Sequence, residues 1–168
     1  MAKAMTSHGS VVTFNGPVEV GVRLVHLLLA LYPKHLGLDS LVTLDYMVVH
    51  TADVGGPESL HPRLPYQSTE ILIRRKLLES GVLLMSSRGL IERIVSYDGI
   101  AYCAGDAAET FVSALEARYF RALRERAQWV ADTFGELDQQ ALQQFRDSLS
   151  DQWITEFQNI ERSLGADS

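Results

Sequence analysis

Three consecutive basic residues, Arg74, Arg75 and Lys76, have the type and spacing in this sequence best suited to binding phosphate. Arg88 and Arg93 follow them closely along the chain. Clustered Lys and Arg side chains neutralise the phosphates of a nucleic-acid backbone. These five residues are therefore candidate nucleic-acid contacts.

The same basic run also fits the solvated face of a helix. Glu70 precedes Arg74 by four residues, and Glu79 follows Arg75 by four. Opposite charges at this helical spacing pair with each other. Acidic residues near Arg93 also dilute the positive charge there. The sequence leaves both interpretations open, contact with phosphate and ion pairing within the protein.

Five histidines invite a metal-site hypothesis: His8, His26, His35, His50 and His61. Their spacings match no ligand pair such as HxxxH or HExxH, and the chain has one cysteine, Cys103. We therefore predict no metal site. His50 and His61 flank a proline-rich segment and are expected to hydrogen-bond its backbone. Cys103 is expected to be a packed, unreactive thiol.

No pattern typical of a catalytic site stands out in the sequence. The segment Asp53-Val54-Gly55-Gly56 resembles a phosphate-binding loop only in its glycines, because no Lys-Ser or Lys-Thr follows it. A nucleophile elbow, paired carboxylates on one element and a nuclease-like cluster of acids with a lysine are also missing. We therefore expect a protein that is not an enzyme and uses no cofactor.

The charges are distributed unevenly along the 168 residues, whose net charge is −6. Residues 63–93 hold six basic and three acidic residues, whereas residues 132–168 hold two basic and eight acidic ones. This pattern indicates one basic and one acidic region rather than a surface that binds nucleic acid throughout. No apolar run is long enough to cross a bilayer, and the first residues have no signal-peptide layout. A cytoplasmic protein without a membrane contact is expected.

Three predicted helices precede and include the basic run. The first begins at Asn15-Gly16-Pro17, the second is capped by Asp39 or Ser40, and the third spans residues 68–80 and ends at Gly81. The first two are expected to bury one apolar face each, formed by Val18, Val22, Val25, Leu28, Leu29 and Tyr32 in the first and by Leu41, Leu44, Met47 and Val48 in the second.

A β-hairpin is predicted after the third helix and a short strand that follows Gly81. Asp98-Gly99 separates two β-rich runs, Leu90–Tyr97 and Ile100–Cys103, as a type I′ turn requires. Three helices followed by a hairpin are the order of a winged helix-turn-helix, in which the hairpin is the wing. We predict an α+β, mostly α fold with a winged helix-turn-helix-like core and additional C-terminal helices. Winged helices bind DNA in some proteins and only proteins in others, so this fold leaves the function open.

A long segment without periodicity, from Thr51 to Gln67, connects the second and third helices. Loops of this length within a compact domain are usually functional or disordered. Its three prolines lower the entropy cost of ordering it, and Leu60, Leu64 and Tyr66 are apolar enough to dock on another surface. We favour an ordered interaction loop.

Two further helices are predicted after the hairpin. Asp106 and Glu109 have the spacing of a capping box for a helix that ends near Phe134. The last helix carries an apolar stripe at spacings of three and four residues: Leu142, Phe145, Leu149, Trp153, Phe157, Ile160 and Leu164. Such a stripe must fold back or be buried in another chain. The expected organisation is a flexible leader (1–13), a winged-helix-like domain (14–134) and a C-terminal amphipathic, partner-binding helix (135–168).

Several short motifs resemble those of the middle-component family of bacterial ABC-three-component systems, which includes the small subunit of Lamassu-type defence systems. The matching residues, between about 14 and 130, are Phe14-Asn15-Gly16-Pro17 with Glu19, Leu44-Asp45-Tyr46 with His50, Gly55-Gly56-Pro57-Glu58-Ser59-Leu60-His61-Pro62, Arg74-Arg75, Leu84-Met85-Ser86 with Arg88-Gly89, Gly99-Ile100 with Tyr102, and Leu123-Arg124-Glu125-Arg126-Ala127 with Trp129-Val130.

The resemblance implies a non-catalytic subunit that bridges an SMC-like ATPase and an effector, commonly a nuclease, acting against phage or plasmids, with DNA contact within the complex as a further expectation. A winged-helix transcription regulator that dimerises through its C-terminal helix is the alternative. Aromatic and Arg anchors dominate protein interfaces. By residue type, the partner-binding candidates are Leu60, His61, Tyr66, Arg124, Trp129, Phe145, Leu149, Trp153, Phe157 and Ile160.

Overall fold

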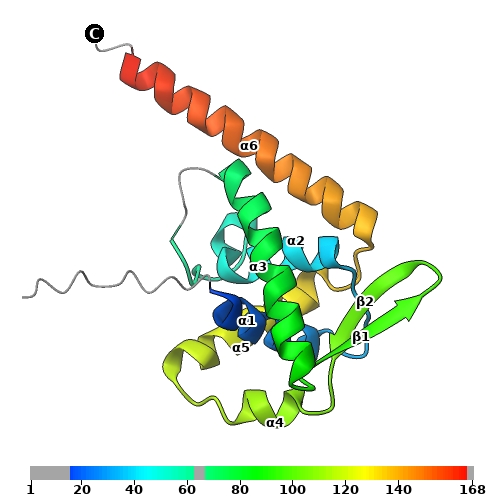
Figure 1. The fold of residues 1–168 in the computed structure, drawn as a ribbon. Coiled ribbons are helices and arrows are strands. Elements are labelled where there is room, and N and C mark those ends of the chain that lie inside the picture. The colour runs from blue at the N-terminus through cyan, green and yellow to red at the C-terminus, as the bar shows by residue number, and fades with distance from the viewer. Residues whose placement is uncertain (1–15, 63–66, 166–168) are drawn as a thin grey trace, which may run out of the picture.

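The computed structural model describes residues 16–62 and 67–165, with side chains omitted at residues 67–73 and at several positions after residue 152. The predicted leader, residues 1–13, and the predicted capping residue Asn15 lie outside the described residues. The elements are α1 (Pro17–Ala30), α2 (Leu38–Val49), the short 3-10 helix η1 (Thr51–Val54), α3 (Gln67–Ser87), β1 (Ile91–Ser96), β2 (Gly99–Ala104), α4 (Ala108–Ser113), α5 (Arg118–Phe134) and α6 (Gln139–Gly165) (Figure 1).

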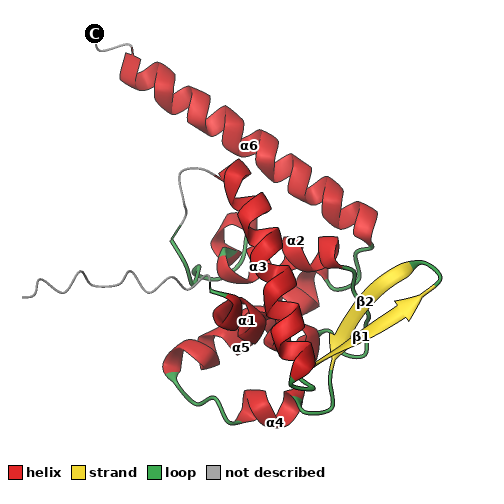
Figure 2. Cartoon of the chain, viewed as in Figure 1, coloured by secondary structure: helices red, strands yellow, loops and turns green. Residues whose placement is uncertain are grey.

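The fold is α+β and mostly α, as predicted: helices surround α1, and the two strands form a small antiparallel sheet at one edge (Figure 2). α1 contacts α2, α3, α4 and α5. Pro17 stands in its first turn, where a missing N–H loses no helical hydrogen bond. Val25 and Leu28 are buried as predicted, but Val18 and Tyr32 are exposed, so the predicted face was wrong at both ends.

α2 packs into the same core through the four residues predicted for it, Leu41, Leu44, Met47 and Val48. It starts at Leu38, after Gly37, and no side chain caps it. The carboxylate of Asp39, predicted as a possible cap, instead accepts a hydrogen bond from Arg75 in α3.

α3 is longer than predicted because Gly81 lies inside the helix rather than at its end. The segment after Gly81, predicted to be a strand, continues the helix to Ser87. A Cβ added to Gly81 would lie 2.9 Å from the backbone nitrogen of Gly21 and 3.0 Å from the carbonyl oxygen of Pro17. The glycine therefore allows α3 and α1 to cross closely, while the left-handed φ of 70° falls on Gly89.

β1 and β2 form the predicted hairpin, but its turn differs from the prediction. Ser96 pairs with Gly99, so the two central residues are Tyr97 and Asp98. A type I′ turn needs a positive φ at both central residues. Among the described residues only glycines have a positive φ, and here it falls on Gly99. The prediction of a type I′ turn at Asp98-Gly99 was therefore wrong.

The hairpin is fixed to the helices at its base. Leu36, in the connection between α1 and α2, exchanges two backbone hydrogen bonds with Tyr102 of β2, at 2.9 and 2.8 Å. Ile91 and Cys103 are buried at the same end. The turn end projects from the body of the protein (Figure 2). The chain thus has three helices followed by a hairpin, the order on which the winged-helix expectation was based.

Two helices, α4 and α5, replace the single helix predicted after the hairpin. No side chain caps α4, so the predicted capping box of Asp106 and Glu109 does not form. α4 ends at Ser113, and a guanidinium nitrogen of Arg124 in α5 donates to the Val112 carbonyl at 2.8 Å. α5 ends at Phe134, as predicted.

α6 packs its first turns against α2 and then extends beyond the rest of the domain (Figure 1). Leu142 and Leu149 are buried. The rings of Phe145 and Phe134 lie 5.2 Å apart between centroids, which ties α6 to the end of α5. The first half of the predicted stripe is therefore part of the core.

Candidate interaction surfaces

A buried cluster of three charges joins α1, α2 and α3. Arg23 donates to both oxygens of Asp45, Nε to Oδ1 at 2.9 Å and the terminal nitrogen to Oδ2 at 3.0 Å. Arg74 donates to Oδ2 of the same carboxylate at 2.7 Å and lies over the ring of Tyr46. Burial alone would raise the pKa of Asp45, but the two guanidinium groups outweigh burial and hold that pKa below its ordinary value. Asp45 is therefore a buried carboxylate that binds two arginines.

This cluster removes Arg74 from the group of exposed basic side chains. Arg74 is only 5% exposed, whereas Arg75 is 44% exposed and Lys76 is exposed. Arg75 pairs with Glu79 at 3.6 Å, as the ion-pair interpretation of this run predicted, and also with Asp39 of α2, which was not predicted. Surface ion pairs contribute little energy and break easily.

Arg88 and Arg93, the other two candidate phosphate contacts, are exposed. Arg88 follows the end of α3, and Arg93 lies on β1 opposite Tyr102. With Arg75 and Lys76 they form the exposed basic residues of α3 and the hairpin, which leaves four of the five predicted side chains accessible to a ligand.

The proline-rich segment folds onto its own protein between residues 55 and 62. Thr51 donates from Oγ1 to the Pro57 carbonyl at 2.8 Å. The backbone N–H of His61 donates to the Val49 carbonyl at 3.1 Å. Arg126 in α5 donates from Nε to the Glu58 carbonyl at 3.0 Å. This part of the loop is therefore ordered by the domain itself, while Leu64 and Tyr66 lie outside the described residues.

Trp129 of α5 closes over this loop. A Cβ added to Gly56 would lie 2.6 to 2.8 Å from three atoms of the Trp129 ring, so a larger residue there would require the ring to move. The ring of Trp129 also lies edge-on to Phe134, and Leu60 packs against the same core. Trp129 and Leu60, named above as partner-binding candidates, thus make contacts within the domain.

The side chain of His61, which was predicted to hydrogen-bond the loop backbone, contacts α5. Its Nε2 lies 2.9 Å from the Tyr119 hydroxyl, and the two rings stack. The pKa of His61 is lowered from 6.5 to about 4. The largest cause is burial, and the nearby Arg23 and His50 lower it further. Burial also raises the pKa of Tyr119. His61 is therefore neutral in the folded protein at neutral pH. The ring of His50 lies 4.5 Å from that of Tyr46.

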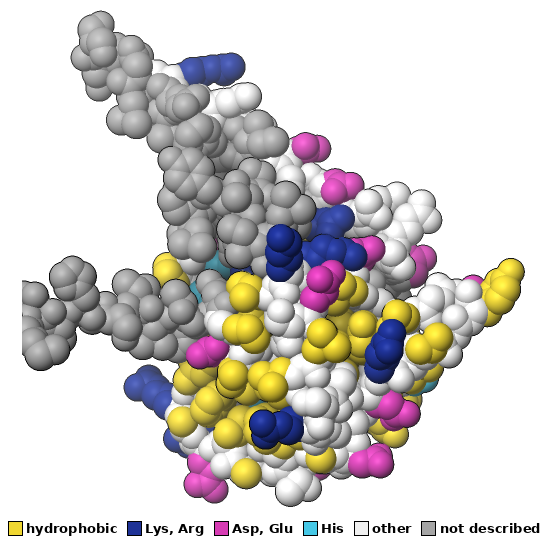
Figure 3. All heavy atoms as spheres, viewed as in Figure 1, with side chains coloured by type: hydrophobic (Ala, Val, Ile, Leu, Met, Phe, Trp, Pro, Cys, Tyr) yellow, Lys and Arg dark blue, Asp and Glu magenta, His cyan; other side chains and the backbone are white. Residues whose placement is uncertain are grey.

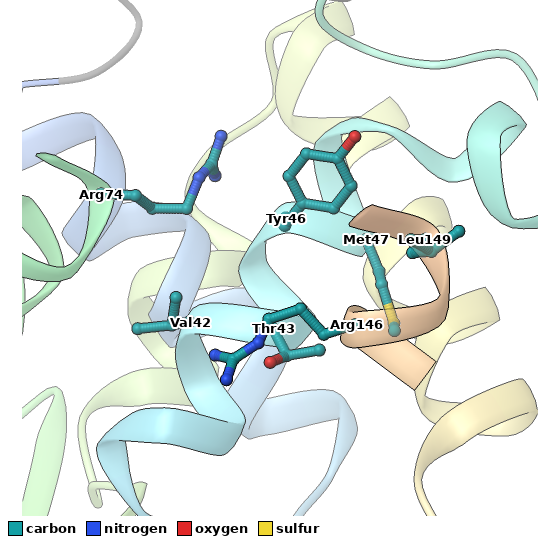
Figure 4. Close-up of a pocket in the computed structure, with 7 residues that line it drawn as sticks. All are labelled: Val42, Thr43, Tyr46, Met47, Arg74, Arg146 and Leu149. Carbon is teal, nitrogen blue, oxygen red and sulfur yellow. The ribbon is translucent and has the colours of Figure 1, made fainter. Parts of the chain in front are cut away.

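A small pocket lies where α6 crosses α2 (Figure 4). It is lined by Val42, Thr43, Tyr46 and Met47 from α2, Arg74 from α3, and Arg146 and Leu149 from α6. The pocket lies beside Leu149, the last residue of α6 that is buried among those whose side chains the structure describes. Trp153, Phe157 and Ile160, the partner-binding candidates further along the helix, have side chains outside the described set.

The turn end of the hairpin carries three exposed apolar side chains, a feature that the analysis of basic residues missed. Val95 is 70% exposed, Ile100 is 43% exposed and Tyr97 is fully exposed. Val95 and Ile100 are directly opposite each other in the sheet. A hydrophobic area is visible at the projecting end of the hairpin (Figure 3). The sequence signal was an aromatic residue immediately before Asp98-Gly99.

Asp45 and Arg23 were also not identified from the sequence as members of a buried ion cluster. Asp45 stands alone in the apolar run Val-Thr-Leu-Asp-Tyr-Met-Val-Val, and Arg23 stands in a similar run of α1. A lone charge in an apolar helix requires a buried counter-charge. That signal was present, but it did not identify which cation pairs with which anion.

Within residues 16–62 and 67–165, no three His, Cys, Asp or Glu side chains come together as metal ligands. No helix of the described chain is long and apolar enough to cross a membrane. Cys103 is buried. This burial is the main cause of the raised pKa of its thiol, and the nearby Glu92 raises that pKa further.

Comparison with known proteins gives one family. Residues 13–156 match the family model described as "ABC-three component (ABC-3C) system Middle Component 2". The match spans α1 to α5, the hairpin and about the first two thirds of α6. Neither a curated protein nor a solved structure matches the chain.

Proposed function

The chain belongs to the middle-component 2 family of ABC-three-component systems, and we propose that it is a non-catalytic bridging subunit of a defence system. In this proposal it links an SMC-like ATPase to an effector, commonly a nuclease, that acts against phage or plasmids, as in Lamassu-type systems. The family match over residues 13–156 is the observation that carries the proposal. The name of the family describes one of three components, so the other two are the expected partners.

The arrangement of polar residues supports a role in assembly rather than chemistry. Asp45, Arg23 and Arg74 are bound to one another in the core, and His61 is bound to Tyr119. These contacts stabilise the domain, and the charged groups of Asp45, Arg23 and Arg74 are engaged with one another. Among the elements that the structure describes, α6 and the hairpin extend from the domain (Figure 1). A rigid body with two projecting elements suits a subunit that holds two partners.

We assign α6 beyond Leu149 to partner binding. Trp153, Phe157 and Ile160 continue the apolar spacing of Leu142 and Leu149. A stripe of this kind needs a second surface to cover it. The acidic balance of residues 132–168 favours a partner surface with basic residues around an apolar groove.

Co-expression of the tagged subunit with the other two components tests the bridging role. Trp153→Asp and Phe157→Asp are expected to abolish co-purification of a partner while the circular dichroism of the subunit stays nearly unchanged. Gln152→Asp, at an exposed position of the same helix, is the matched control and should retain the partner. Unfolding of the two α6 variants in isolation would show that the stripe is core, and retention of both partners would remove α6 from the interface.

A second candidate function is a winged-helix regulator that binds DNA and dimerises through α6. The observations that favour it are the backbone pairing of Leu36 with Tyr102, which fixes the hairpin beside the helices, and the exposed basic residues Arg75, Lys76, Arg88 and Arg93. This function requires binding of the purified subunit to duplex DNA, weakened by Arg75→Ala with Lys76→Ala and falling steeply with salt. Weak or absent binding at low salt would exclude it.

A further inference from the structure

The turn of the hairpin carries a side chain, that of Tyr97, that is not buried against the rest of the fold. Two-residue hairpin turns favour Gly, Asn and Asp because of their backbone conformations. Here Tyr97 occupies the first central position, and its side chain is fully exposed. A large aromatic ring without a contact gains no burial energy, so its presence is not explained by the stability of the hairpin.

The neighbouring residues extend this apolar surface. Val95 and Ile100 lie opposite each other next to the turn, and both are exposed. A cross-strand pair of β-branched side chains does stabilise a hairpin. Within the described part of the chain, however, three of the six exposed large hydrophobic residues belong to this one projecting tip. Such a concentration marks an interaction site rather than scattered surface residues.

The base of the hairpin holds this tip in place. Leu36 and Tyr102 exchange two backbone hydrogen bonds, and Ile91 and Ala104 are buried where the strands meet the helices. A tip on a fixed base loses little conformational entropy when it binds. The hairpin is therefore preorganised to insert its end into a partner.

The charge at the tip distinguishes between classes of partner. Asp98 is exposed in the turn beside Tyr97, whereas the exposed Glu92 and Arg93 lie at the base of the hairpin, opposite Cys103 and Tyr102. A carboxylate at the leading end is repelled by phosphates and by an anionic membrane surface. The same carboxylate is attracted by Lys or Arg side chains at the edge of a protein pocket.

We propose that the hairpin tip, formed by Val95, Tyr97, Asp98 and Ile100, docks into an apolar pocket with a basic rim on one of the other two components of the system. Tyr97 is the anchor, because a buried tyrosine is among the commonest dominant residues of protein interfaces. This inference rests on the proposed bridging function and names a second contact of that bridge, separate from α6.

The test measures the affinity of the purified full-length subunit for each of the other two purified components. A triple variant, Val95→Thr, Tyr97→Asn and Ile100→Thr, removes the apolar surface but keeps residues suited to strands and turns. We expect it to weaken binding to one component by at least about 30-fold, the effect of losing a dominant interface residue. Asp98→Lys should weaken binding to the same component.

Leu83→Gln is the matched control, because Leu83 is as exposed as Val95 but lies on α3. It should leave both affinities unchanged, and thermal melting of each variant checks that the subunit is folded. Wild-type affinity of the folded triple variant for both components would overturn the tip proposal and leave the bridging function standing. Failure of the wild-type subunit to bind either component would overturn both. Loss of self-association or of duplex binding in the triple variant, with both components still bound, would also overturn the proposal.

Discussion

The guanidinium of Arg74 lies 2.7 Å from the Asp45 carboxylate, and both side chains are almost completely removed from solvent. The neighbouring Arg75 is nearly half exposed. Two adjacent arginines of one basic run therefore have opposite roles. Arg74 stabilises the contact of α3 with α2, and Arg75 remains available at the surface.

Asp45 is predicted to be more important for stability than either arginine that binds it. Asp45→Asn leaves the buried guanidinium groups of Arg23 and Arg74 without the carboxylate that they share. Breaking a buried ion pair from one side costs about 3–5 kcal/mol. Arg74→Met should cost less, because the pair of Arg23 with Asp45 survives. Urea unfolding measures both losses.

Arg75→Ala is the control for these variants. Its ion pairs with Asp39 and Glu79 are at the surface, so the free energy of unfolding should change by less than about 1 kcal/mol. Equal and small losses for Arg74→Met and Arg75→Ala would contradict the buried position of Arg74.

The free energy of unfolding is predicted to decrease as the pH is lowered below about 6.5, because His61 must then take up a proton. Burial lowers the pKa of His61 to about 4 in the folded protein, against 6.5 for an unperturbed histidine. The stability that depends on neutral His61 is therefore fully present above pH 6.5. It is lost as the pH falls toward 4, because the unfolded chain binds a proton at this histidine at a higher pH than the folded protein does. His26 has its pKa lowered by burial as well and contributes in the same direction.

His61→Gln tests this dependence, because glutamine keeps a group able to hydrogen-bond Tyr119 and does not titrate. The slope of unfolding free energy against pH between 6.5 and 4 should become shallower than in the wild type. His35→Gln, at an exposed histidine, controls for the loss of an imidazole. An unchanged slope in His61→Gln would mean that the folded protein does not hold this histidine neutral.

Gly81→Ala is predicted to destabilise the protein, although alanine is about 1 kcal/mol better than glycine in a helix. The added Cβ would lie 2.9 Å from the backbone of Gly21, which cannot move aside as a flexible side chain does. Ser80→Ala, at the exposed neighbouring position, should be neutral or slightly stabilising. Chemical denaturation distinguishes the two, and a gain of stability in Gly81→Ala would refute the close crossing of α1 and α3.

Trp129→Ala is predicted to loosen the segment between residues 55 and 62. The Trp129 ring covers Gly56, so its loss opens the loop to solvent. Hydrogen exchange at the amides of Gly56 and His61, which donate to Thr51 and Val49, should become faster. Tyr32→Ala removes an exposed aromatic side chain and should leave both amides as protected as in the wild type. Unchanged exchange in Trp129→Ala would show that the loop is held without the ring.

Local patterns in the sequence predicted most of the helices and the hairpin. The apolar spacing of α2 and the β-rich runs on both sides of Asp98-Gly99 were sufficient, because each element buries or pairs residues close in sequence. Gly81 misled the prediction. The reason for a glycine there is the backbone of Gly21, far away in the sequence, and spacing within α3 carries no information about it.

The candidate surfaces were harder to predict for the same reason. A run such as Arg74-Arg75-Lys76 looks uniform in sequence, and only the three-dimensional position of Asp45 distinguishes the first residue from the second. Trp129 and His61 have types common at protein interfaces, yet their contacts with Gly56 and Tyr119 lie within the domain. Residue type identifies side chains that bind something, but the fold decides whether the binding partner is the same chain.

The central claim, that this subunit bridges two other components, is tested most directly by affinity purification of the tagged protein from its native host at moderate salt, followed by mass spectrometry. The bridging account predicts recovery of a large SMC-like ATPase together with a nuclease-like protein, and loss of one of them with Trp153→Asp. Recovery of the subunit alone with DNA fragments would contradict that account and support the regulator.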